Sequence, residues 1–371
     1  MSPSFETRST SRRKFLAKIA GTSAGLALAG RLGAQGQGAR RIDVHHHFVP
    51  DAYFAYQRRH NPAAVNLWSL SKDLEDMDRF GTATAMLSIT QPAFNLGDRD
   101  EIRTVARECN EAAAKLVTDK PGRFGNFAGI PLKDTEGSLK EIEYAFDTLK
   151  ADGICVLSSY GDVWLGNQMF WPVYEELNRR HAVIHVHPTP PNCCMNLPIA
   201  KDGVPNEGAM IEYGTDTTRT IASLIFSGTA KRFPNISWIF SHAGGTMPFL
   251  IERFLQFGAS AEIIPGITTT GQRVGISGNR MPGGEVLAQI RRFYYDTAQS
   301  SNPIALEALK RVVHASQIVY GTDYWFRTAE DTDRGLRTAR VFDSREMAAV
   351  NRGNVERILP LLKLRAGLDR P

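Results

Sequence analysis

The feature that most constrains the fold of this chain is a regular alternation of strand-like and helix-like segments from residue 41 onward. Eight short segments are apolar or β-branched and bounded by turn residues, as buried strands are: 41–46, 84–89, 124–130, 153–157, 182–187, 237–240, 293–296 and 317–320. Stretches with helical periodicity lie between most of them, for example at 100–119, 135–150, 169–180 and 217–227. The alternation predicts an α/β fold, a (β/α)8 TIM barrel with insertions, formed as one catalytic domain by residues 41–365.

The alternative fold is an open, doubly wound sheet. No Gly-x-Gly-x-x-Gly motif follows an early strand of this sequence, and it has no phosphate-binding loop. The sequence therefore favours the barrel. In a barrel all strands end at one mouth, so residues that are far apart in the sequence converge there.

The N-terminus has the order of a twin-arginine export signal. A paired arginine, Arg12-Arg13, precedes a mildly apolar stretch at 19–29 and small residues that suit cleavage after Ala29 or Ala34. We interpret residues 1–34 as a twin-arginine signal peptide and 35–40 as a linker; a disordered basic tail is the alternative. The signal predicts the export machinery as a partner and a periplasmic location. The apolar stretch is too short to span a membrane, so no stable membrane insertion is expected after cleavage.

The positive net charge of the chain belongs to this N-terminus. The whole sequence has 44 Lys and Arg against 39 Asp and Glu, a net charge of +5. Residues 1–34 hold six of the basic residues and one of the acidic ones, which leaves 38 of each from residue 35 onward. A body without excess positive charge offers no electrostatic footprint for a polyanion, so we expect no nucleic-acid partner.

Histidines of the metal-binding type stand at the ends of predicted strands. The first strand ends in three consecutive histidines. Because side chains alternate along a strand, His45 and His47 share one face and His46 lies on the other, and two imidazoles spaced in this way can hold one ion. In the fifth strand His187 comes last and is expected at the mouth. His185 lies a layer deeper, and we interpret it as a hydrogen-bonded core residue.

Two more strand ends carry a proton-transfer group and a carboxylate. His242 follows the sixth strand, and the small residues after it leave room for a substrate beside an imidazole suited to proton transfer. Asp323 follows the eighth strand after Gly-Thr, where an aspartate is otherwise a turn or helix-cap residue. Since these positions follow different strands, the barrel predicts that they converge in space.

These motifs resemble those of the metal-dependent amidohydrolase superfamily. They are most similar to its branch of aminocarboxymuconate-semialdehyde, γ-resorcylate and 6-methylsalicylate decarboxylases. The matching motifs are Ile-Asp-Val-His45-His46-His47, Val-His187-Pro, Ser-His242-Ala-Gly-Gly-Thr-Met-Pro-Phe and Tyr-Gly-Thr-Asp323-Tyr. The resemblance implies a single divalent ion, most often zinc with manganese as the alternative, and no organic cofactor. It implies that the metal ligands are His45, His47, His187 and Asp323. It also implies His242 as the acid/base, with Asp323 sharing the proton.

Two local features bear on this resemblance. The bridging lysine or glutamate of two-metal relatives would belong in the fourth strand, and residues 153–160 contain neither, which agrees with a single ion. Family members often have a proline after Gly-Thr-Asp-Tyr, whereas this chain has Trp325 and Phe326, which either stack on a planar substrate or pack the loop. Ser158, Ser159 and Tyr160 either line the pocket or form a polar turn.

The four cysteines do not form the pattern of a disulfide framework. Cys193 and Cys194 are adjacent, so a bond between them would be strained. We expect free, mostly buried thiols.

The leading functional hypothesis is non-oxidative decarboxylation of an aromatic or unsaturated carboxylic acid, with His242 or a metal-bound water supplying a proton to the carbon that loses carbon dioxide. The alternative is a metal-dependent hydrolase that opens a lactone or a similar C–O or C–N bond with a water whose pKa the ion lowers. His242 argues against a third possibility, a metal-binding protein without catalysis. We expect a small carboxylic acid as substrate, with Arg99, Arg103 and Arg219 as candidates to bind its carboxylate, and the resemblance implies a homo-oligomer.

Overall fold

A computed structural model describes residues 41–194, 208–257, 281–360 and 362. These residues belong to one compact unit, Arg40–Pro371. The predicted signal peptide at 1–34 and linker at 35–40 lie outside the described residues.

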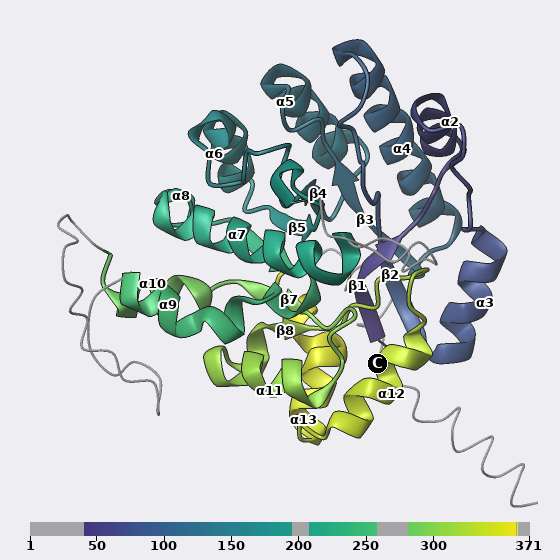
Figure 1. Cartoon of the computed structure of the whole chain (residues 1–371). Helices are drawn as coiled ribbons and strands as arrows, with labels where there is room; N and C mark the ends of the chain where they lie inside the picture. The colour runs from purple at the N-terminus through teal and green to yellow at the C-terminus, as the bar shows by residue number, and fades with distance from the viewer. Residues whose placement is uncertain (1–40, 195–207, 258–280, 361, 363–371) are drawn as a thin grey trace, which may run out of the picture. The chain divides into compact units, whose positions relative to one another are not determined.

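Eight parallel strands, paired in chain order, form the centre of this unit (Figure 1). They are β1 (Arg41–His47), β2 (Thr82–Ser88), β3 (Phe124–Gly129), β4 (Gly153–Leu157), β5 (Val183–His187), β6 (Ser237–Phe240), β7 (Tyr294–Asp296) and β8 (Ile318–Val319). The first and last strands also meet, because the Val44 N–H donates to the Tyr320 carbonyl at 3.0 Å. The strands therefore form the nearly closed (β/α)8 barrel that the sequence predicts.

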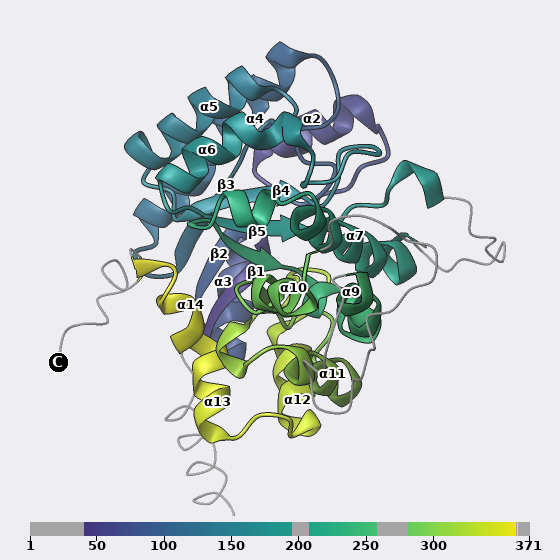
Figure 2. The ribbon, with the colours of Figure 1, turned by 90° about the vertical axis from the view of Figure 1, so that its left-hand side faces the viewer.

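Helices surround the strands in both views (Figures 1 and 2). The longer ones are α2 (Asp51–His60), α3 (Leu70–Phe80), α4 (Arg99–Asp119), α5 (Thr135–Glu143), α6 (Trp171–Arg179), α7 (Tyr213–Phe226), α10 (Gly283–Ile290), α11 (Pro303–Val312) and α12 (Ala329–Ala339). Shorter ones are α8 (Thr229–Arg232), α9 (Ile251–Phe257), α13 (Ser344–Ala348) and α14 (Asn354–Glu356). Among the described helices, none has both the length and the apolar character needed to cross a membrane.

The predicted strands coincide with the observed ones, and their ends differ by at most two residues. The helical stretches given as examples from the sequence do not include α2 and α3, the two helices between β1 and β2. The signals for α3 are local: Ser69 accepts a hydrogen bond from the Lys72 N–H, and Gly81 ends the helix with a positive φ of 77°.

Alternating side chains of β5 contribute to the apolar core on one face and to the polar interior of the barrel on the other. Ile184 and Val186 pack in the apolar layer between strands and helices. Val183 belongs to the cluster inside the barrel. The residues on the same face as Val183 are His185 and His187, so both imidazoles lie inside the barrel and His187 is nearest the C-terminal end.

Strand β1 contains a bulge. Asp43 pairs with Ala85 and His46 with Leu87, so three steps along β1 match two steps along β2. The bulge brings Asp43 to the same side of β1 as His46, and their side chains meet at 3.1 Å.

The cysteine prediction is correct in part. Cys109 and Cys155 are free and buried. Cys193 is disulfide-bonded and exposed, so the expectation of a free thiol is wrong for this residue. It lies in a short turn of helix, Asn192–Cys194, after β5 rather than in the core, so burial does not protect it as it protects the other two.

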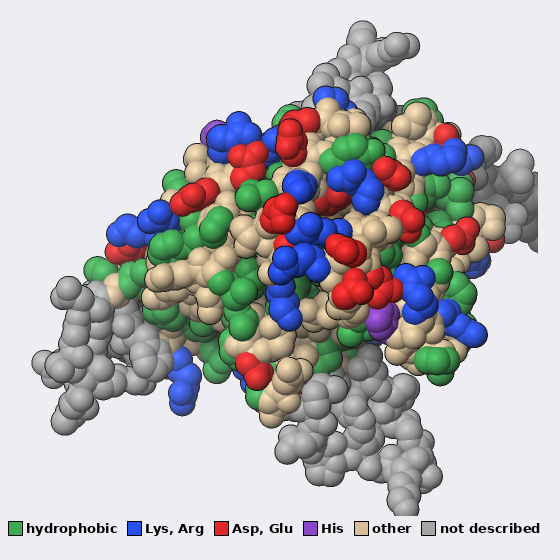
Figure 3. All heavy atoms as spheres, turned by 90° about the horizontal axis from the view of Figure 1, so that it is seen from above, with side chains coloured by type: hydrophobic (Ala, Val, Ile, Leu, Met, Phe, Trp, Pro, Cys, Tyr) green, Lys and Arg blue, Asp and Glu red, His purple; other side chains and the backbone are tan. Residues whose placement is uncertain are grey.

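Charged side chains of both signs are interspersed on the face drawn in Figure 3. This mixture is in keeping with the balanced charge of the chain from residue 35 onward.

Candidate functional site

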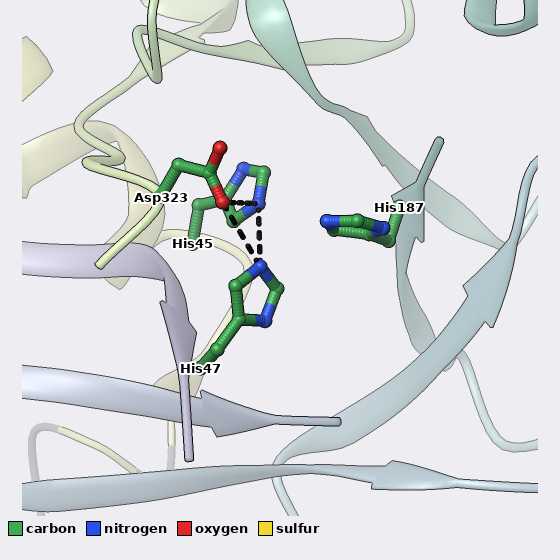
Figure 4. Close-up of side chains that lie close together, drawn as sticks. All are labelled: His45, His47, His187 and Asp323. Atoms are coloured by element: carbon green, nitrogen blue, oxygen red, sulfur yellow. Dashed lines mark hydrogen bonds and ion pairs between the residues drawn. The ribbon is translucent and has the colours of Figure 1, made fainter. Parts of the chain in front are cut away.

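Four side chains from three strand ends meet at the C-terminal mouth of the barrel. They are His45 and His47 of β1, His187 of β5 and Asp323, which follows β8; their potential ligand atoms all lie within 4.8 Å of one another. Figure 4 shows His187 reaching from β5 toward the other three. All four side chains are buried. We refer to them as the histidine–aspartate group.

The spacing within this group suits a metal ion. His45 Nε2 and His47 Nε2 are 3.1 Å apart. Asp323 Oδ1 lies 3.2 Å from the first of these nitrogens and 3.1 Å from the second. Ligand atoms at about 2.1 Å from a tetrahedral zinc ion are roughly 3.4 Å from one another. The atoms of His45, His47 and Asp323 are thus slightly closer than an ion requires, and a small expansion around it would suffice.

The chemistry of the donor set also suits an ion. Three imidazoles and one carboxylate form a donor set that zinc accepts, and manganese is compatible with it. The residues present therefore fit one divalent ion.

The electrostatics of the group favour ligand-competent side chains. Burial lowers the pKa of His187, and the neighbouring charges of His47 and His45 lower it further, so its imidazole is neutral. Burial would raise the pKa of Asp323, but the charge on His45 and the hydrogen bonds from the neighbouring histidines together outweigh it and hold the carboxyl well below its usual range. Burial lowers the pKa of His45, whereas Asp323 and Asp296 raise it to about 10, so in the absence of an ion a proton takes the place of the cation.

Asp296, at the end of β7, connects this group to His242. Its Oδ2 accepts a hydrogen bond from His45 Nδ1 at 2.8 Å. Its Oδ1 accepts the backbone N–H groups of His242 at 2.8 Å and Ala298 at 3.0 Å. A carboxylate can only accept, so His45 carries a proton on Nδ1 and directs Nε2 toward the site. Asp296 is thereby a residue with a positioning role that the sequence did not assign.

His242 lies beside the histidine–aspartate group without being part of it. Its Nε2 is 3.4 Å from Asp323 Oδ2. Its ring stacks on that of His45 with centroids 5.3 Å apart. The backbone of His242 is left-handed, with a φ of 55°, in the short turn after β6. At this turn the chain leaves the direction of β6, and the His242 ring lies at the mouth of the barrel beside His45.

A cavity of about 580 Å³ opens beside His242. Its lining residues come from the helical turn Gly208–Glu212, the start of α7, the turn after β6 and the segment after β7: Ala209, Met210, Ile211, Tyr213, Gly214, Thr215, His242, Gly245, Thr246, Gln299 and Ser300. The small residues predicted to leave room are necessary, because a Cβ at Gly245 would clash with the Gly214 carbonyl. Gln299 donates from its amide to Asp323 Oδ2, so the cavity adjoins the histidine–aspartate group.

A family model described as amidohydrolase matches residues 42–361. The chain belongs to this family. As an amidohydrolase it is 36% identical over 292 residues to 6-methylsalicylic acid decarboxylase from Penicillium expansum, which covers 76% of this chain and 84% of the relative. It is 24% identical to 2-amino-3-carboxymuconate-6-semialdehyde decarboxylase from Dictyostelium discoideum, over 71% of this chain and 69% of the relative. The predicted resemblance to this branch is confirmed.

Solved structures share the fold of this amidohydrolase. A dihydroxybenzoic acid decarboxylase from a Polaromonas species, with bound manganese and the inhibitor 2-nitroresorcinol, superposes with a TM-score of 0.69 at 20% identity. The match covers 86% of this chain and 97% of that one. A 5-carboxyvanillate decarboxylase from Sphingomonas paucimobilis gives a TM-score of 0.72 at 21% identity, over 87% and 99% of the two chains.

Other predicted residues of the amidohydrolase lie elsewhere. His185 is fully buried, 3.4 Å from the Ser241 hydroxyl and 3.5 Å from Asp296, as a core histidine would be. Among the described residues it belongs to a second group of potential ligands, formed with His45 and Asp296. Ser158 and Ser159 both donate to Asp216, so they hold the turn after β4 rather than face the cavity.

The three arginine candidates form ion pairs away from the lining of this cavity. Arg103 pairs with Asp134 and Glu136, and Arg99 lies 4.0 Å from Asp134. Arg219 pairs with Glu212 at 3.2 Å. Among the residues described as lining the cavity there is no lysine or arginine.

The two aromatic residues after Asp323 remain compatible with both predicted roles. Trp325 and Phe326 stack on each other with centroids 5.1 Å apart. Each lies 6.2 Å from the His47 ring, and Phe326 is 56% exposed. Trp325 packs against the apolar cluster that contains Phe48, and both rings meet the His47 ring nearly at right angles.

Proposed function

We propose that this amidohydrolase is a metal-dependent carboxy-lyase that removes carbon dioxide, without redox chemistry, from an aromatic carboxylic acid of the hydroxybenzoate class. The observation that carries the proposal is the placement of His242, which lines the cavity and has its Nε2 3.4 Å from Asp323. A proton-transfer group that faces a cavity next to a metal-binding donor set is what decarboxylation of a ring requires. The 36% identity to a 6-methylsalicylic acid decarboxylase supports the same class of substrate.

The ion is proposed to be held by His45, His47, His187 and Asp323. We propose zinc, since three of the four donors are imidazoles, with manganese as the alternative. When bound, a divalent ion supplies a Lewis-acidic charge that fixes the carboxylate and a neighbouring oxygen of the substrate. No organic cofactor is required by this chemistry.

The chain's own residues then perform the proton transfer. We propose that His242 carries the transferred proton on Nε2, which lies 3.4 Å from Asp323 Oδ2 and has no hydrogen-bond partner among the described residues. The proton moves from Nε2 to the ring carbon that carries the carboxylate. The bond between this carbon and the carboxylate breaks, its electron pair restores the aromatic ring, and carbon dioxide leaves. Asp296 holds the backbone of His242 and the ring of His45 in register for this step.

The test is metal analysis of the purified protein followed by measurement of carbon dioxide released from 6-methylsalicylate and dihydroxybenzoates. About one zinc or manganese per chain with carbon dioxide released supports the proposal. A metal-loaded protein that releases none but opens lactones is a hydrolase, the alternative reaction. A chain that binds no metal after loading overturns the proposed site.

A matched pair of variants isolates His242. His181 is also a histidine with a left-handed backbone, at a φ of 53° against 55° for His242, but it lies on the surface. Asparagine tolerates this conformation, so His242→Asn and His181→Asn make the same change in the same backbone setting. His242→Asn is expected to lose turnover by at least about 100-fold with metal content intact, and His181→Asn to retain both. Loss of metal together with activity in His242→Asn would make His242 a ligand rather than the acid.

We also propose export by the twin-arginine route into the periplasm, and assembly as a homo-oligomer. The export proposal rests on the order of residues 11–34. Fusing residues 1–40 to a reporter that requires this route should export it, and replacing Arg12-Arg13 by two lysines should stop export. The molar mass of the purified protein in solution tests the proposed homo-oligomer, which a monomeric mass would contradict.

A further inference from the structure

A second buried polar cluster lies on the other side of β1 from the proposed metal. Asp43, 1% exposed, has no part in the proton transfer described above. Its Oδ1 accepts the Thr322 N–H at 3.0 Å and the His45 N–H at 3.1 Å, and its Oδ2 accepts the Thr322 hydroxyl at 2.6 Å. One carboxylate thus binds the residue before Asp323 and the backbone of His45, which belong to opposite edges of the barrel sheet.

His46 extends this cluster to the surrounding helices. Its Nδ1 lies 3.1 Å from Asp43 Oδ2, and its Nε2 lies 2.8 Å from Asp73 Oδ1 in α3. The His46 ring stacks on Tyr324 with centroids 4.5 Å apart and an interplanar angle of 10°. The other oxygen of Asp73 accepts the indole N–H of Trp68 at 2.9 Å, so the far end of the cluster is also fixed.

The backbone around Asp323 needs such support. Asp323 has a φ of 67°, a left-handed conformation that costs a non-glycine residue free energy and persists where its surroundings impose it. Two backbone hydrogen bonds tie it to β1: the Asp323 N–H donates to the His45 carbonyl at 2.9 Å, and the His47 N–H donates to the Tyr324 carbonyl at 3.0 Å. The Thr322 hydroxyl also accepts the Tyr324 N–H at 3.1 Å.

We infer that Asp43, His46 and Thr322 form a positioning cluster that sets the separation between Asp323 and the two β1 histidines, and through it the affinity for the ion. The inference rests on the proposed function, because it takes these residues as metal ligands. Asp323 follows a strand of two residues, whereas His45 and His47 lie within a strand of seven. The cluster therefore links Asp323, which has little strand structure to hold it, to the two histidines of β1.

The test compares three threonine variants. Thr322→Val is nearly isosteric and removes the hydroxyl that bonds Asp43 and Tyr324, and Thr322→Ser restores it. Thr84→Val is the matched control, because Thr84 is also buried and its hydroxyl also bonds inside the barrel, to the Gly122 carbonyl at 2.7 Å, but at the opposite end of the strands. Zinc affinity is measured by competition with a chromophoric chelator, and thermal unfolding is measured on the metal-free proteins.

We expect Thr322→Val to bind zinc about 10- to 100-fold more weakly, the range typical of residues that orient metal ligands. Thr322→Ser should recover most of this loss, and Thr84→Val should bind zinc as the wild type does, with a similar fall in Tm to Thr322→Val. Wild-type affinity in Thr322→Val overturns the inference, as does an equal loss in Thr84→Val. If the wild type itself binds no zinc or manganese, the proposed function fails instead.

A second variant covers the case in which Thr322→Val does not fold. Asp43→Asn keeps the shape of the side chain but removes the charge that faces His46. It should weaken zinc binding by a similar factor, and wild-type affinity in this variant overturns the inference.

Discussion

Replacing Asp296 by asparagine is expected to move a proton on a metal ligand. The Asp296 Oδ1 accepts two backbone N–H groups, from His242 at 2.8 Å and Ala298 at 3.0 Å. The amide oxygen of an asparagine would stay there, and its NH2 would face His45 Nδ1. Two donors cannot share a hydrogen bond, so His45 would keep its proton on Nε2, the nitrogen that must be free to bind an ion.

The size of the effect follows from the bond that is lost. His45 Nδ1 donates to a carboxylate oxygen at 2.8 Å, with both groups fully buried. Hydrogen bonds to charged groups contribute about 1.5–3 kcal/mol, which is roughly 10- to 150-fold in a binding constant. We therefore predict zinc affinity reduced by about 10- to 100-fold, in line with other carboxylates that orient metal-ligand histidines.

The assay is zinc binding by chelator competition, with Asp216→Asn as the matched control. Asp216, like Asp296, is a fully buried carboxylate that accepts several hydrogen bonds. Its donors are the side chains of Ser158, Ser159 and Trp164. Those donors hold the turn after β4 and do not belong to the histidine–aspartate group. Unchanged affinity in Asp296→Asn, or an equal loss in Asp216→Asn, would refute the tautomer argument.

Three further predictions concern stability and the cavity. Chelation of the ion should lower Tm in calorimetry, because an ion that binds only the folded chain stabilises it by about 2.7 kcal/mol at 100 times Kd; an unchanged Tm would contradict binding at a folded site. Gly245→Ala, at a φ of 66° and against the Gly214 carbonyl, should lose about 1–3 kcal/mol in urea unfolding and raise KM. The hydrogen bond from Arg103 lowers the pKa of Asp134, so this carboxylate contributes stability that is present above its ordinary pKa of about 3.9 and is lost as pH falls through the lowered value. Below about pH 4, Tm should therefore fall less steeply with decreasing pH in Asp134→Asn than in the wild type, as measured by thermal unfolding at a series of pH values.

Much of the barrel could be predicted because its strands are buried on both sides. The run Ala182–His187 is apolar except for two histidines, and turn residues bound it, so local composition identifies the strand. Alternation then predicts that His185 and His187 share a face, and the structure has both inside the barrel. The convergence of His45, His47, His187 and Asp323 follows from the rule that barrel strands end at one mouth.

The supporting residues could not be predicted, because their partners depend on register. Strict alternation would place Asp43 on the face of His45 and His47, but the bulge in β1 moves it to the side of His46. The role of Asp296 depends on which strand end lies opposite His45, and nothing local to β7 contains that information. The ion pairs of Arg103 depend on register in the same way, since its acidic partners Asp134 and Glu136 are more than 30 residues away.

The direct contact between the first and last strands also has a consequence for the order of folding. The Asp323 N–H donates to the His45 carbonyl, which joins residues from the two ends of the barrel sequence. Contacts between residues so far apart in the sequence require a large loop to close, so we expect them to form late in folding. A partly folded chain in which β1 to β5 are assembled already contains three imidazoles, but it lacks the carboxylate and the bonds that hold β1 from the other edge. The chain can therefore bind the ion with full affinity only after β1 has paired with the segment that follows β8. We expect the rate of metal binding during refolding to report this closure of the barrel.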